Sequence, residues 1–204
     1  MLKILTDDLI SINRQAIATL KPSYTFEQII TQLTTSWGGG DTTAHLFAAS
    51  ASTPSTPSAN ISFGINTSNP TNFTALGQSS SSEGNGLIAM TALQVTTARL
   101  CFQIWDDLIP SSLIESGEAG ANITLNYSSA TTDNGSYTSR LTYNTIPKDI
   151  AADQIWLSSN WTTNADSGMV NGGYGLTTLL HEIGHALGLS HPGIYNATPG
   201  VTIT

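Results

Sequence analysis

A short segment near the end of the chain carries the residues best suited to chemistry: residues 181–191 read His-Glu-Ile-Gly-His-Ala-Leu-Gly-Leu-Ser-His. On an α-helix, residues four apart lie on one side, one turn apart, so His181 and His185 are predicted to face the same point. Gly188 can adopt the left-handed conformation that ends a helix, and the chain would then turn back and bring His191 to that point. Neutral imidazole nitrogen is a preferred zinc donor, and three protein ligands leave zinc one open position. The spacing therefore predicts one catalytic zinc ion held by His181, His185 and His191.

Glu182 follows the first of these histidines and would lie beside the metal without ligating it. That position suits a general base for a zinc-bound water molecule, whose pKa the metal lowers to about 7. Three of the four histidines in the chain fall in this one segment, which argues against a chance match. The fourth, His45, has no partner motif and is interpreted as a structural or surface residue.

The helix that carries the motif needs a buried side to hold the ligands in place. A Gly- and Asn-rich loop at 164–175 precedes it, and Pro192 prevents its continuation. Its predicted core-facing side chains are Leu176, Leu179, Leu180, Ile183 and Leu187.

Hydrophobic periodicity predicts two further helices and several short strands. A first helix is predicted at 21–37, because Thr25 and Gln28 form a capping box and an apolar stripe follows. A long helix is predicted at 87–108. Its predicted buried face consists of Leu93, Ala98, Cys101, Phe102, Ile104, Trp105 and Leu108.

Short strands are predicted between these helices and at intervals after the long helix. Strands at 44–48 and 61–65 flank a turn at 52–58, and a polar loop follows at 77–86. Beyond the long helix, we predict a half-buried strand at 121–127, a turn at 133–135, and strands at 139–144 and 154–158. The order helix, strands, helix, strands, helix predicts a single α+β domain with a mixed sheet.

Composition narrows the classes of function. The chain has 204 residues, of which 10% are charged, and a formal net charge of −8 with six scattered basic residues. Nucleic-acid binding is excluded because it needs clustered Lys and Arg. The single cysteine, Cys101, allows no intrachain disulfide and is predicted to be a small buried hydrophobe. No stretch reaches the length of a membrane span, and no signal peptide is visible at the N-terminus.

The extended motif resembles that of the metzincin zinc endopeptidases. Its continuation, His191-Pro192-Gly193 with Tyr195-Asn196-Ala197, looks like the serralysin branch. The segments 21–25, 121–128 and 154–157 are also similar to serralysin segments.

The resemblance implies a twisted mixed sheet backed by two long helices, hydrolysis of internal peptide bonds of polypeptide substrates, and a secreted enzyme. It also implies that 139–144 is an edge strand to which substrate adds. Residues 1–20 would be a propeptide-like extension, and 21–204 the N-terminal part of the catalytic domain.

Three departures from the serralysin pattern leave alternatives open. Ile194 stands where serralysins usually have aspartate. The printed sequence, which ends at Thr204, contains neither the methionine turn with its following tyrosine nor the calcium-binding repeats of the family's C-terminal half. Calcium is therefore expected only in such a repeat region.

Two alternatives to an active protease follow. One is a zinc-binding but inactive interaction module. The other is a split or truncated protease completed by a downstream segment or a second chain, in which case residues 1–204 alone would bind zinc weakly and cleave slowly.

Overall fold

The computed structural model describes residues 25–35, 44–50, 53–68, 82–117, 120–131, 135–142 and 150–191. The predicted extension at 1–20, most of the turn predicted at 133–135 and the segment after His191 lie outside these ranges.

The centre of the fold is a five-stranded mixed sheet of order β4-β3-β5-β7-β6. The strands are β3 (Asn60–Ile65), β4 (Ser112–Glu115), β5 (Ile123–Ser128), β6 (Tyr137–Thr142) and β7 (Ile150–Ser158). Strands β4, β3, β5 and β7 run parallel to one another, whereas β6 pairs antiparallel with β7. Within the described residues, β6 therefore forms one edge of the sheet.

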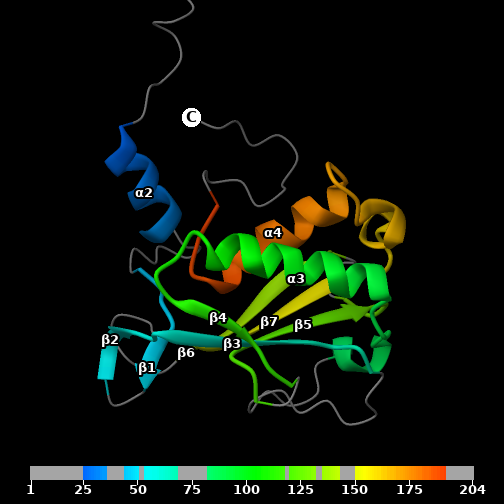
Figure 1. Cartoon of the computed structure of the whole chain (residues 1–204), viewed down its shortest axis with the longest axis horizontal. Helices are drawn as coiled ribbons and strands as arrows, with labels where there is room; N and C mark the ends of the chain where they lie inside the picture. Colours follow the sequence, from blue (N-terminus) through cyan, green and yellow to red (C-terminus); the bar gives the residue numbers. More distant parts are fainter. Residues whose placement is uncertain are drawn as a thin grey trace, which may run out of the picture.

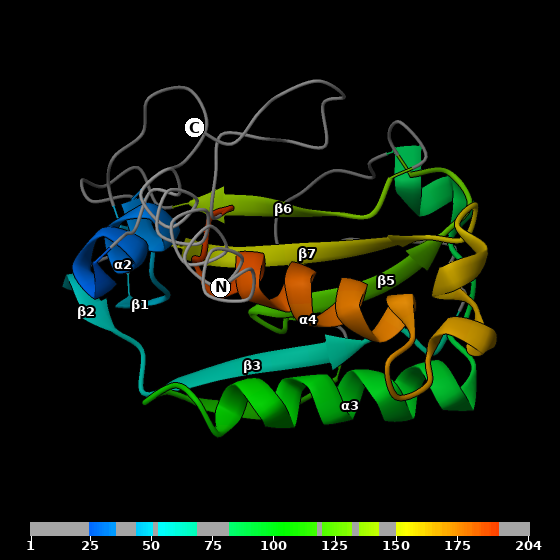
Figure 2. The same ribbon diagram turned by 90° about the horizontal axis from the view of Figure 1, so that it is seen from above.

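Two long helices, α3 (Ala92–Asp106) and α4 (Tyr174–Ala186), lie side by side on one face of the sheet (Figures 1 and 2). A shorter helix, α2 (Phe26–Thr35), projects beyond the C-terminal end of α4 (Figure 1). The prediction of an α+β domain with a mixed sheet backed by two long helices is confirmed. Among the described helices, none is both long enough and apolar enough to cross a membrane.

Helix α3 begins later than predicted, because Thr91 caps it. The Thr91 hydroxyl accepts from the Gln94 backbone N–H, and the Gln94 side chain accepts from the Thr91 backbone N–H, which completes a capping box. The predicted buried face is partly wrong, since Leu93, Ile104 and Leu108 are 41%, 37% and 70% exposed. The core side instead combines the predicted Ala98, Cys101 and Phe102 with Val95. Helical spacing fits both stripes, and packing against the sheet selects the one that contains Val95 in place of Leu93, Ile104 and Leu108.

The strand and turn predictions also need correction. The strand predicted at 44–48 begins only at Ala48. The turn predicted at 52–58 contains a strand, β2 (Thr53–Pro57), which pairs antiparallel with β1 (Ala48–Ser50). Its prolines are tolerated because this two-stranded ribbon has only edges. Strand β4 was not predicted. Strand β5 is fully buried rather than half-buried, because it lies between β3 and β7 and its polar side chains are enclosed too.

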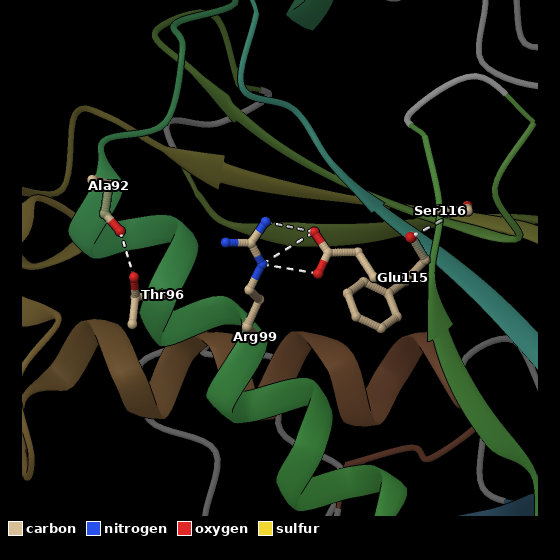
Figure 3. Close-up of polar contacts among 6 residues, drawn as sticks. Ala92, Thr96, Arg99, Glu115 and Ser116 are labelled. Atoms are coloured by element: carbon tan, nitrogen blue, oxygen red, sulfur yellow. Dashed lines mark hydrogen bonds and ion pairs between the residues drawn. The ribbon is translucent and has the colours of Figure 1, made fainter.

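An ion pair links α3 to the edge strand β4 (Figure 3). The Arg99 guanidinium donates to both carboxylate oxygens of Glu115 at 2.8–3.1 Å. Hydrogen bonding to Arg99 lowers the pKa of Glu115. Because both side chains are well exposed, water screens the pair and its contribution to stability is small.

The core between α3 and the sheet includes a stacked aromatic pair. The rings of Phe63 and Phe102 have centroids 3.9 Å apart and planes inclined by 10°. Cys101 is fully buried beside them, as predicted, and burial raises its pKa to about 12. The thiol is therefore a packing group.

Replacing Phe102 by alanine should lower the free energy of unfolding by about 3–5 kcal/mol, because a large buried ring leaves a cavity under α3. Leu100→Ala, on the exposed side of the same helix, is the matched control and should cost less than about 1 kcal/mol. Urea unfolding of both variants is the measurement. Equal losses would show that α3 does not pack through Phe102.

Candidate metal centre

Helix α4 is fixed by its apolar side and by a close approach to α3. Leu179 and Ile183 are fully buried, and the other predicted core residues, Leu176, Leu180 and Leu187, pack partly buried against the same core. The indole N–H of Trp105 donates to the Leu180 carbonyl at 3.1 Å. A Cβ at Gly184 would lie 3.0 Å from the Trp105 ring, so only glycine fits there without movement.

The end of α4 is a Schellman turn. The Gly188 N–H donates to the His185 carbonyl at 3.0 Å, and the Leu189 N–H donates to the Gly184 carbonyl at 2.9 Å. Gly188 has φ of +100°, as its predicted left-handed role requires, and a Cβ there would lie 2.2 Å from the backbone oxygen of His45. Both the backbone conformation and the available space therefore select glycine.

Helix α2 holds the segment that follows this turn. The Ser190 N–H donates to the Leu33 carbonyl at 2.7 Å, and the Ser190 hydroxyl donates to the Gln32 carbonyl at 3.0 Å. The Gln32 side-chain amide donates to the His191 carbonyl at 3.1 Å. The first part of α2 is exposed, whereas its last turn is partly buried and fixes the backbone that carries His191.

The three predicted histidines meet at one point. The Nε2 atoms of His181, His185 and His191 lie 2.9, 3.0 and 3.2 Å from one another, and together they form a group that could hold a metal ion. Three tetrahedral ligands on bonds of about 2.0–2.1 Å would place their donors about 3.3 Å apart, close to the distances observed.

The protonation of these rings also fits a cation. The His185 Nδ1 lies 2.7 Å from the Leu189 carbonyl oxygen, which can only accept, so Nδ1 carries the hydrogen. In a neutral ring, Nε2 then presents its lone pair to the cluster. Burial lowers the pKa of His191, and burial followed by the charge of His191 lowers the pKa of His181. The neutral rings that bind zinc are therefore favoured.

Glu182 follows His181 in α4 and is 5% exposed. The hydroxyl of Thr138, on β6, lies 3.0 Å from the Glu182 carboxylate Oε2 and 3.0 Å from the Glu182 carbonyl oxygen. Burial raises the pKa of Glu182 to about 7, against the opposite effect of the hydrogen bond from Thr138. A carboxyl group with such a pKa can take up and release a proton near neutral pH.

The structure thus brings the three predicted histidines together, and it adds supports that the sequence did not indicate. His45 is not part of the metal-binding group, and its backbone instead packs against the turn at Gly188. Thr138, Gln32 and Ser190 went unrecognised. Thr138 lies 44 residues from Glu182 in sequence and Gln32 lies 159 from His191, so no local pattern connects them.

Comparison with known proteins identifies the class to which the chain is similar. No protein-family model matches it. Serralysin A from Dickeya chrysanthemi is 32% identical over 189 residues, which is 88% of this chain and 34% of that protein. Serralysin C from the same organism is 32% identical over 192 residues, again 88% of this chain. Metalloprotease AprA from Pseudomonas entomophila is 34% identical over 114 residues, or 53% of this chain.

These relatives are proteases by name, and the similarity to the serralysins extends along most of the chain. The chain spans about a third of the length of Serralysin A and Serralysin C.

Gly188→Ala should destabilise the fold more than Gly172→Ala does. Both glycines have positive φ, at +100° and +76°, but a Cβ at Gly172 meets nothing within 4 Å. The control therefore isolates the backbone cost of about 1–2 kcal/mol. Gly188→Ala should cost at least about 1 kcal/mol more, because it also pushes His45 away. Urea unfolding provides both values, and equal losses would contradict the tight packing at the turn.

Proposed function

We propose that the chain is the N-terminal part of the catalytic domain of a serralysin-like metzincin, a zinc metalloendopeptidase that hydrolyses internal peptide bonds of proteins. The observation that carries the proposal is the convergence of three imidazole nitrogens, together with a buried carboxyl group on the residue that follows His181. Similarity to the serralysins over 88% of the chain supports it. We also propose that residues 21–204 belong to this domain and that the protein is exported from the cell.

In this proposal His181, His185 and His191 hold one zinc ion, and a fourth position remains for water and substrate. When bound, zinc would supply Lewis-acid chemistry, which polarises the scissile carbonyl and lowers the pKa of water. Glu182 takes a proton from the attacking water and passes it to the leaving amine. Its burial beside the histidines suits this role, because a purely structural zinc site does not need that carboxylate.

The edge strand β6 is the proposed substrate-binding element. The strand predicted at 139–144 overlaps β6 (Tyr137–Thr142), which pairs with β7 on one side only within the described part of the chain. An extended polypeptide can add to such an edge through main-chain hydrogen bonds. Thr138 contacts Glu182, so a chain bound along β6 would pass close to the proposed base.

The purified chain should bind one zinc ion per molecule, and His185→Ala should abolish this binding. His185 is the central ligand, because its Nε2 lies within 3.0 Å of both other Nε2 atoms. His45→Ala is the matched control and should keep the full zinc complement. Metal analysis after dialysis measures the ratio. A full complement in His185→Ala would overturn the proposed ligand set.

Glu182→Ala should reduce hydrolysis of a casein-type substrate by at least about 100-fold, the typical contribution of a general base, and should leave zinc bound. Glu115→Ala removes an exposed carboxylate far from the histidines and should keep the activity of the unmodified chain.

Activity of Glu182→Ala within a few-fold of the unmodified protein would contradict the role of Glu182. A chain that binds zinc but hydrolyses nothing would favour the interaction module or the split protease. Addition of the downstream residues separates these two, because it restores activity only to a split protease.

A further inference from the structure

The hydroxyl of Thr138 is the contact that the proposed chemistry leaves unexplained. It lies in the edge strand β6 and reaches across to α4, where both a side-chain and a main-chain oxygen of Glu182 are within 3.0 Å. Among the described residues, it is the one side chain that hydrogen-bonds the Glu182 carboxylate. A threonine on a sheet edge ordinarily needs no such partner, since its hydroxyl can bond to water.

The Glu182 side chain needs a fixed partner because it is almost completely buried. A buried carboxylate without a donor is strongly disfavoured. Its three side-chain torsions would also leave it free to turn away from the histidines. The Thr138 hydroxyl donates to Oε2 and so restricts these torsions.

We propose that Thr138 is a positioning residue that holds the Glu182 carboxylate in place beside the three histidines, and that it couples this carboxylate to strand β6. The inference rests on the proposed function, in which β6 binds substrate and Glu182 moves the proton. One hydroxyl contacts both the carboxylate and the carbonyl oxygen of Glu182, so a single side chain links the base to β6. Thr138 does not itself touch the reacting atoms.

The competing explanation is that Thr138 only joins β6 to α4 structurally and does not affect the base. Three variants distinguish this structural role from the positioning role. Thr138→Val removes the hydroxyl and keeps the branched shape, whereas Thr138→Ser keeps the hydroxyl. Thr124→Val is the matched control. It changes a buried threonine of β5 whose hydroxyl, among the described residues, accepts one long hydrogen bond of 3.5 Å from the Asn126 side-chain amide.

With a peptide substrate, Thr138→Val should lower kcat about 10-fold or more with KM within twofold, the range typical of outer-shell partners. Zinc content should not change. Thr138→Ser should restore kcat to within about threefold, and Thr124→Val should match the unmodified chain. In a Glu182→Gln background, Thr138→Val should add no further loss, because both changes act through one carboxylate. An unchanged kcat in Thr138→Val, or an additive loss in the double variant, would overturn the proposal.

Crystal structures of the unmodified chain and of Thr138→Val, grown under the same conditions, test the same point without an activity measurement. The carboxylate should be ordered against Thr138 in the first and displaced in the second, and an identical position in both would refute the positioning role. Should Thr138→Val not fold, Thr138→Ala replaces it in both experiments. A chain that binds no zinc and hydrolyses nothing would defeat the proposed function, while the structures would still decide the role of Thr138.

Discussion

The constraint on which the rest of the centre depends is the point at which α4 ends. Gly188 can take φ of +100° without strain. Because it has no side chain, the backbone of His45 can occupy the space that a Cβ at this position would need. One turn therefore performs two tasks. It sends the chain back so that His191 reaches the other two histidines, and it places the Leu189 carbonyl where it fixes the protonated nitrogen of His185.

Close packing of α3 against α4 sets the position of that turn relative to the sheet. Gly184 lies against the Trp105 ring, and the indole N–H is bonded to a carbonyl of α4. Because α4 cannot move without a change in this contact, His181 and His185, which both lie on α4, are held rigidly. Glu182 is buried where α4 packs against β6, and burial and the Thr138 hydroxyl act in opposite directions on its pKa. A cation at the histidines would favour the charged carboxylate further.

The sequence was sufficient for those parts of the site that follow from local spacing. The helical repeat relates His181 to His185, and the conformational freedom of glycine predicts the turn at Gly188. Helix positions, the three C-terminal strands of the sheet and the α+β class also followed from periodicity. The face of α3 could not be predicted, because Leu93 and Val95 fit helical stripes equally well and only contact with the sheet chooses between them. The supports at Gln32, Thr138 and Ser190 depend on contacts between distant segments, which no local pattern encodes.

The central claim is that the three imidazoles form one catalytic metal site with an open position. Anomalous diffraction at the zinc edge, from crystals of the chain grown with zinc, tests it directly. We expect one strong peak about 2.0–2.1 Å from the Nε2 atoms of His181, His185 and His191, with no fourth protein ligand. A site closed by a fourth side chain, or a crystal with no peak at the histidines, would contradict it.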